Sequence, residues 1–235
     1  MDRGAFRRSM RILERRYPIE DWTVGMTPFE VLVSTILSQS TTVANERRGM
    51  QGLRDAFGDI SPSTLAMADE GTIARAIWHA GLARQKAARI KEVARRIAAD
   101  WLGDIGSLLT LPPEQAREAL MTLPGVGPKT ADVVLAMAAD RPIFPVDTHI
   151  ARIAGRWNLT RSRRYEKIRR ALEAWTPPAK RKVWHLALIR HGREVCKALR
   201  PWCDRCPVSK DCDWYRTHTS RPAVRSRTTR PRRRA

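Results

Sequence analysis

A lysine at the start of an expected helix is the first residue of this 235-residue chain whose position suggests chemistry. Lys129 follows the turn LPGVGP, in which Gly125 and Gly127 allow positive φ and close approach of a ligand to the backbone. Pro128 suits the first helical position, so the N–H groups of the next turn are free to bind a phosphate oxygen. The segment predicts a phosphate-binding hairpin between two helices, with a tight turn that binds nothing as the alternative.

The position of Lys129 also predicts an unusual charge state. A helix N-terminus destabilises a nearby cation, so we expect the pKa of the Lys129 amine to lie below that of a free lysine. A neutral amine is a nucleophile that can form a Schiff base with C1′ of a sugar. The alternative role for Lys129 is that of an exposed lysine in contact with a phosphate.

An aspartate 18 residues later is the expected partner of this lysine. Asp147 stands in PVDTHI before an apolar-periodic segment, which predicts that it caps a helix. One helix and a turn separate it from Lys129, so two antiparallel elements would bring the side chains to one cleft. An acid there would stabilise positive charge on an oxocarbenium-like sugar. Asp147 can cap the helix and act in catalysis at the same time. His149, two residues later, is expected to have a structural role.

All four cysteines lie within 17 residues, at Cys196, Cys203, Cys206 and Cys212. Thiolates this close share a metal centre or are oxidised. Only one pair has the two-residue spacing common in structural zinc sites, and the outer gaps have six and five residues. The pattern therefore favours a four-thiolate iron–sulfur cluster, with a zinc site or disulfides as the alternatives.

The charge balance predicts a polyanionic partner. Lys and Arg number 44 against 24 acids, giving +20, which favours nucleic acid over an anionic membrane surface. The longest apolar stretch, near Val31–Leu37, is too short for a membrane span, and the N-terminus lacks an apolar signal core. We therefore expect a protein of the prokaryotic cytoplasm, associated with the nucleoid. Residues 217–235 carry seven arginines and no acid, which predicts a disordered basic tail.

Helical periodicity dominates the elements that must position these residues. The pattern predicts an all-α chain of about ten helices with short loops. Thr27, Pro28 and Glu30 have the spacing of an N-cap, a first-turn proline and a capping-box acid. The expected helices cover the apolar segment after Pro28 and residues 4–17, 43–57, 63–68, 70–79, 84–101, 112–121, 128–139, 148–157, 164–174 and 180–191.

Three motifs, LPGVGPKTADVVL, PVDTHIARI and C-x6-C-x2-C-x5-C, closely resemble those of the endonuclease III family in the same order. The resemblance runs from about Phe29 to Cys212. It implies a two-lobed helix-hairpin-helix glycosylase fold, with a six-helix barrel at 22–141 and an iron–sulfur lobe formed by 1–21 and 142–214. The resemblance also implies that DNA lies in the cleft between the lobes, with the damaged nucleotide flipped into a pocket.

The resemblance further implies what the site residues do. Lys129 matches the family's Schiff-base lysine and Asp147 its catalytic aspartate, and the four cysteines match the ligands of a four-iron, four-sulfur cluster. These matches imply a bifunctional DNA glycosylase and AP lyase of base excision repair. Such an enzyme would remove oxidised pyrimidines from duplex DNA and cleave the abasic site by β-elimination.

Two further segments resemble the family's DNA-contacting loops. Loop 38–42, with Gln39 and Ser40, matches the loop that fills the gap left by the flipped base. Leu82 matches an apolar wedge between bases, with an ordinary loop contact as the alternative. The hairpin adds further expected DNA-binding residues, Gly125, Val126, Gly127 and Thr130.

Other functions of the same chain stay open at this point. One is a mismatch- or uracil-directed glycosylase of the same fold. Others are a non-catalytic DNA-binding iron–sulfur module and an electron-transfer protein. For the favoured function, the expected partner is double-stranded DNA with damaged bases or abasic sites, bound by a monomer that has no membrane partner.

Overall fold

The computed structural model describes residues 1–18 and 21–219, and this part of the chain contains helices and no β-strand. The all-α expectation is therefore confirmed. None of these helices combines the length and the apolar character that a membrane span requires. The helices are α1 (Arg3–Arg16), α2 (Pro28–Leu37), α3 (Val43–Phe57), α4 (Pro62–Met67), α5 (Glu70–Ala76), α6 (Ala83–Asp100), α7 (Ile105–Thr110), α8 (Pro113–Met121), α9 (Pro128–Ala138), α10 (Thr148–Arg156), α11 (Tyr165–Trp175), α12 (Arg181–Glu194) and α13 (Asp213–Thr219), with 3-10 turns η1 (Trp78–Ala80), η2 (Pro178–Lys180), η3 (Cys203–Arg205) and η4 (Ser209–Asp211).

Helix starts follow the capping chemistry of the sequence. At α2, Thr27 Oγ1 accepts the N–H of Glu30 at 3.2 Å, and Glu30 Oε2 accepts the N–H of Thr27 at 2.8 Å. This reciprocal pair satisfies two N–H groups that a helix start otherwise leaves unpaired, and an N-cap contributes about 1 kcal/mol. The expected capping box is therefore confirmed.

Two helices lie outside the expected set. α7 has six residues and follows its N-cap Asp104, whose carboxylate accepts the N–H groups of Gly106 and Ser107 at 2.7 and 3.1 Å. The sequence gives this segment the cap residue Asp104, but the six residues after it are too few for a clear helical periodicity, and no first-turn proline marks the start as Pro62 does for α4. α13 extends to Thr219, so the disorder expected from residue 217 is wrong for residues 217–219. Residues 220–235 of the expected tail lie outside the described residues.

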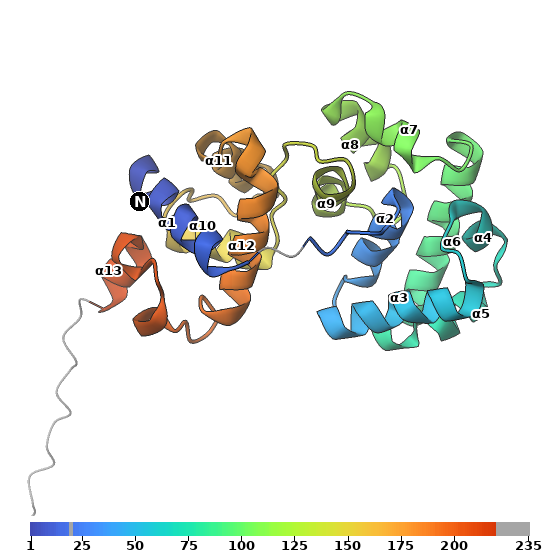
Figure 1. Cartoon of the computed structure of the whole chain (residues 1–235), viewed down its shortest axis with the longest axis horizontal. Helices are drawn as coiled ribbons and strands as arrows, with labels where there is room; N and C mark the ends of the chain where they lie inside the picture. Colours follow the sequence, from blue (N-terminus) through green and yellow to red (C-terminus); the bar gives the residue numbers. More distant parts are fainter. Residues whose placement is uncertain (19–20, 220–235) are drawn as a thin grey trace, which may run out of the picture.

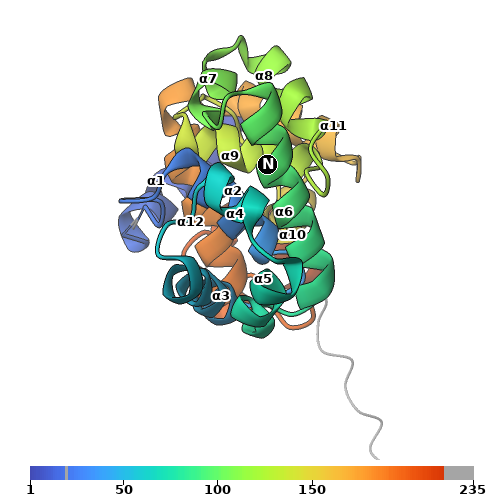
Figure 2. The ribbon, with the colours of Figure 1, turned by 90° about the vertical axis from the view of Figure 1, so that its right-hand side faces the viewer.

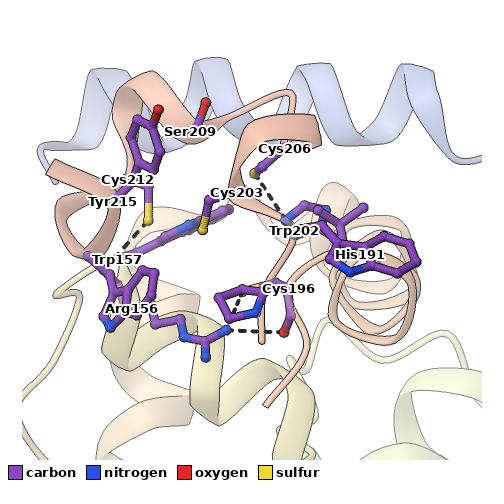
Figure 3. A pocket seen from close by; sticks show the side chains of 13 residues that line it. Arg156, Trp157, His191, Cys196, Trp202, Cys203, Cys206, Ser209, Cys212 and Tyr215 are labelled. Atoms are coloured by element: carbon purple, nitrogen blue, oxygen red, sulfur yellow. Dashed lines mark hydrogen bonds between the residues drawn. The ribbon is translucent and has the colours of Figure 1, made fainter. Parts of the chain in front are cut away.

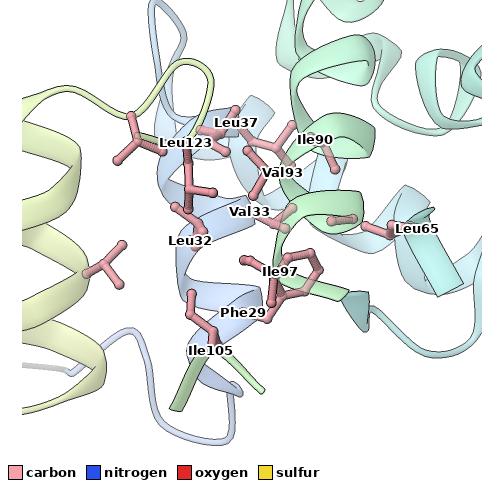
Figure 4. Packing of buried hydrophobic residues seen from close by; sticks show 14 of the residues in the cluster. Phe29, Leu32, Val33, Leu37, Leu65, Ile90, Val93, Ile97, Ile105 and Leu123 are labelled. Atoms are coloured by element: carbon pink, nitrogen blue, oxygen red, sulfur yellow. The ribbon is translucent and has the colours of Figure 1, made fainter. Parts of the chain in front are cut away.

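Helices α2–α9 form one end of the molecule around a common core (Figure 1). α2 is central to this core, and eight of its ten residues are buried. Figure 4 shows Val33 and Leu37 of α2 beside Ile90 and Val93 of α6, with Leu123 of the hairpin near the end of α2. Burial of each such side chain contributes about 1.5–3 kcal/mol, so the hairpin rests on a well-packed base.

Helix α1 joins α10–α12 in a second core, although it lies at the other end of the sequence (Figure 1). Phe6 is fully buried, and its ring meets Trp157, Trp175 and Trp184 edge-on at centroid distances of 6.0, 5.6 and 5.8 Å. The apolar face of the basic helix is thus covered and its arginines point outward. Figure 2, turned so that the other end of the molecule faces the viewer, shows α6 of the first core running beside α4 and α5.

Helix α9 lies where the two cores meet. Leu186 of α12 packs against a small buried cluster from α2 and α9, formed by Val31, Val133, Ala136 and Met137. We propose that the two cores are the lobes expected at 22–141 and at 1–21 with 142–214. The first turn of α9, which carries Lys129, is then at the junction of the lobes.

Candidate active site and cysteine cluster

The hairpin before α9 has the tight turn that the sequence predicts, but only one glycine adopts a left-handed backbone. Gly125 has φ +77°, a region that L side chains rarely adopt. Gly127 has φ −94° and ψ −178°, an extended backbone, so of the two properties that a glycine allows it does not use positive φ. A Cβ at Gly127 would meet no atom within 4 Å, and α9 has no side-chain N-cap. The open backbone therefore leaves the first N–H groups of α9 available to an anion.

Lys129 is the second residue of α9 and is half-buried. Burial lowers the pKa of its amine, and the positive charge of Arg193 lowers it further, while the negative charge of Asp147 opposes both. The expected direction of the pKa shift is confirmed. Desolvation is the largest cause of the shift, and it adds to the unfavourable position of a cation at a helix N-terminus.

Asp147 lies at the start of α10, as its place in the sequence predicts. Its Oδ1 accepts the N–H of Ile150 at 2.8 Å, so the carboxylate is the N-cap of that helix. Its negative charge also acts on Lys129, whose pKa it raises against the effect of burial. The capping bond holds one oxygen of the carboxylate in place.

His185 of α12 belongs to the same site, although the sequence gave no reason to choose it. Its Nδ1 lies 2.9 Å from the carbonyl oxygen of Pro145, two residues before Asp147. Burial lowers the pKa of His185 to about 4, against the opposing charge of Asp147, so its imidazole is neutral at pH 7. A single histidine within the apolar segment VWHLALI carries no motif, and only the packing of α12 reveals its neighbours.

The depressed pKa of His185 predicts a loss of stability in acid. A group with a folded pKa near 4 and an ordinary value of 6.5 contributes stability that is present above pH 6.5 and is lost as pH falls through 4. We expect wild type to lose about 2–3 kcal/mol more than His185→Gln between pH 7 and 4.5, measured by urea unfolding. Equal losses in the two proteins would contradict a neutral buried His185.

A buried charge network fixes α9 against α8 and α11. Asp132 is fully buried, and Arg117 Nε donates to its Oδ1 at 2.6 Å. Tyr165 Oη donates to Oδ2 at 2.7 Å, and the same hydroxyl accepts the N–H of Val146 at 3.4 Å. Burial raises the pKa of Asp132, and the two arginines near it, Arg117 and Arg169, oppose that rise. The Tyr165 hydroxyl thus links the helix of the lysine to the residue before Asp147.

Gln39 extends from the loop after α2 to the hairpin. Its Nε2 donates to the carbonyl oxygen of Gly125 at 3.1 Å and to Thr130 Oγ1 at 3.5 Å. Arg89 of α6 donates from Nη1 to Gln39 Oε1 at 3.4 Å. The structure therefore brings Gln39 and two of the expected hairpin residues together, and adds Arg89, which the sequence did not indicate.

The remaining expected DNA-contacting residues differ in exposure. Leu82 is 59% exposed, a large apolar side chain open to solvent, and Ser40 is exposed as well. Val126 and Thr130 are buried at 5%, so their side chains support the hairpin from inside. Contacts from Val126 and Thr130 to a ligand would therefore involve the backbone.

The four cysteines border one cavity of about 320 Å³, measured out to its open mouth (Figure 3). Its wall also includes Trp157, Trp202 and His191. Arg156 donates to Cys196 Sγ at 3.0 Å, and burial raises the pKa of Cys206 to about 11. All four are free thiols, and within the described residues no three His, Cys, Asp or Glu side chains lie close enough to hold a single metal ion.

Comparisons with known proteins agree with this arrangement. Residues 33–178 match the family model described as HhH-GPD superfamily base excision DNA repair protein. Endonuclease III of Thermotoga maritima is 34% identical over 203 residues, which cover 86% of this chain and 90% of that protein. Endonuclease III of Sulfolobus acidocaldarius is 35% identical over 206 residues, with the same coverage of 86% and 90%.

Two solved structures with DNA share the fold. A non-covalent endonuclease III–DNA complex matches with a TM-score of 0.82 at 26% identity, over 94% of this chain and all of that one. A trapped covalent endonuclease III–DNA intermediate matches with a TM-score of 0.81 at 26% identity, over 93% of this chain and 99% of that one. The likeness therefore extends over both lobes.

Proposed function

Since the chain belongs to the HhH-GPD superfamily of base excision DNA repair proteins, as a relative of endonuclease III, we propose that its lysine–aspartate site releases oxidised pyrimidines from duplex DNA. The protein is a DNA glycosylase and AP lyase of base excision repair. The observation that carries the site assignment is the half-buried Lys129, whose amine has a lowered pKa and interacts with Asp147. This pairing supplies a nucleophile beside an acid.

The chemistry follows from those two groups. The neutral Lys129 amine attacks C1′ of the extruded nucleotide as the bond from C1′ to the base breaks and the base leaves with a proton. Asp147 stabilises the positive charge that develops on the sugar. This attack leaves C1′ bonded to both the lysine nitrogen and the ring oxygen O4′. The protonated imine forms when the C1′–O4′ bond breaks and O4′ takes a proton from solvent. The imine makes a C2′ proton acidic, and loss of that proton expels the 3′ phosphate as the bond from C3′ to oxygen breaks.

The surrounding residues bind and orient the DNA. The open N–H groups at the start of α9 suit a backbone phosphate, and the basic surface releases counterions on binding. Gln39, Ser40 and Leu82 would fill the gap that the extruded nucleotide leaves, because Gln39 contacts the hairpin and the other two are exposed. Extrusion costs a few kcal/mol and costs least for a weakly stacked lesion.

The four cysteines fit a four-iron, four-sulfur cluster. Four thiols border one cavity, and the Arg156 guanidinium donates a hydrogen bond to Cys196 Sγ. Cys196, Cys203, Cys206 and Cys212 would hold the cluster, which when bound would tie the loop after α12 to α13.

Removal of one ligand tests this cofactor. We expect wild type to carry about four iron atoms and four sulfides per chain and a visible absorbance band. Cys206→Ser should lower the iron content and the melting temperature together, because the loop loses its cross-link. A colourless protein that contains zinc instead would contradict the cluster.

A lesion panel tests the proposed function. Matched duplexes containing thymine glycol, uracil, a T:G mismatch or A opposite 8-oxoguanine should be incubated with enzyme and borohydride. We expect base release and a trapped adduct with thymine glycol, and little with the other three. Preference for T:G or uracil would assign the chain to mismatch or uracil repair, and tight lesion-blind binding without release would leave only a DNA-binding module.

A further inference from the structure

Lys86 is a buried cation that none of the chemistry above uses. It lies in the first turns of α6, is 1% exposed, and is held without a carboxylate partner among the described residues. Its Nζ donates to the carbonyl oxygen of Leu37 at 2.7 Å and to that of Ala80 at 2.8 Å. A buried ammonium group is costly unless it is paired, so this position is held for a reason other than the packing of the core alone.

The two carbonyl groups belong to the ends of two different elements. Leu37 is the last residue of α2 and Ala80 the last residue of η1. Carbonyl groups at helix ends have no partner within the helix and carry partial negative charge. The ammonium group of Lys86 therefore satisfies both ends at once and joins them across 43 residues of sequence.

Each of these ends leads directly into one of the proposed gap-filling loops. Gln39 and Ser40 follow Leu37, and Leu82 follows Ala80. Ser40 has φ +54° and Leu82 has φ +51°, both left-handed values that non-glycine residues rarely adopt. Such conformations persist only where the surrounding structure holds them in place.

Helix α3 packs against the same two residues, Leu37 and Ala80, that Lys86 joins. A Cβ added to Gly49 would lie 3.2 Å from Ala80 Cβ and 3.3 Å from Leu37 Cδ1. α3 therefore packs closely over the same two residues whose carbonyl groups bind Lys86. The starting points of both loops are held between α3 on one side and the Lys86 ammonium group on the other.

We propose that Lys86 is a positioning residue that holds the two gap-filling loops in register, so that both enter the DNA together when a nucleotide is extruded. The inference rests on the proposed glycosylase function. It assigns Lys86 no contact with DNA, because its side chain is buried. Its effect on the reaction is transmitted through the backbone of Leu37 and Ala80.

Lys86→Met tests the inference, since methionine is of similar length but donates no hydrogen bond. We expect base release from a thymine glycol duplex to slow about 100-fold, the scale of a displacement of about 1 Å. Affinity for an undamaged duplex should change less than about threefold, because the hairpin and the basic surface are intact. Fluorescence of a 2-aminopurine placed opposite the lesion should lose the increase that accompanies gap filling in wild type.

Single-stranded DNA separates positioning from misfolding. An abasic site in a single strand has no gap to fill, yet it still needs Lys129. Borohydride trapping on that substrate should be equal in Lys86→Met and wild type, whereas loss of both activities would show general damage and overturn the inference. Leu65→Ala is the matched control, because Leu65 is fully buried in the same core and its loss should lower the melting temperature without reducing the fluorescence change.

A double-mutant cycle gives the sharpest outcome. If Lys86 acts through the loops, Lys86→Met should have no further effect in a protein that already carries Gln39→Ala and Leu82→Ala. Additive losses would assign Lys86 another role. Wild type that neither releases thymine glycol nor forms the trapped adduct would instead refute the proposed function, so the two failures are distinguishable.

Discussion

Lys129→Ala is expected to abolish the borohydride-trapped adduct with an abasic duplex. Removing a nucleophile lowers turnover on the order of 10⁴-fold or more, and no other lysine has been placed beside Asp147. Alanine is a good helix former and Lys129 is not part of the buried charge network, so folding should be retained. Trapping is measured by the slow-migrating protein–DNA band on a denaturing gel.

A matched lysine controls for charge in this experiment. Lys167 is exposed on α11, away from the hairpin in sequence, and Lys167→Ala removes the same charge. This variant should trap as wild type does, with at most a small loss of DNA affinity. Undiminished trapping by Lys129→Ala would remove the Schiff-base assignment and require another amine.

The pH dependence of trapping should report the environment of Lys129. Only the neutral amine attacks, so the rate rises with pH through the pKa of Lys129. Burial and Arg193 lower that pKa below its ordinary value of 10.5, and the midpoint should therefore fall below 10.5. A midpoint at or above 10.5 would mean that the amine is as hydrated as a surface lysine.

Asp147→Asn is expected to lower base release about 10²–10⁴-fold while leaving the fold intact. Asparagine is as good an N-cap as aspartate, so its side-chain oxygen can keep the bond to the N–H of Ile150. What the substitution removes is the negative charge beside the developing positive sugar. Release is measured with a thymine glycol duplex under single-turnover conditions, and DNA affinity by a binding titration.

The same variant should behave differently on a preformed abasic site. The negative charge of Asp147 raises the pKa of Lys129, so its removal should move the midpoint of the trapping profile to lower pH. Trapping at neutral pH should therefore be retained while base release is lost. Asp147→Ala would add a loss of about 1 kcal/mol of stability from the missing cap. Full base release by Asp147→Asn would reduce Asp147 to a capping residue.

Features set by short stretches of chain were predictable. The Thr27 capping box, the helix that starts at Pro128 and the cap at Asp147 each depend on residues within one turn of one another. The cysteine spacing is equally local, since 17 residues can close on one centre whatever the rest of the fold does. Residue types at fixed short separations determined the hairpin, the candidate nucleophile and its acid.

What only the tertiary structure decided depends on contacts between distant segments. The pKa of Lys129 is lowered chiefly by burial, which requires other helices to pack around α9, and its neighbour Arg193 comes from α12. His185 and Lys86 carry no recognisable motif. They gain their importance from the carbonyl groups that they meet 40 and 49 residues away. Desolvation and hydrogen bonds of this kind arise when helices pack, so the sequence identified the reacting groups and the fold determined their environment.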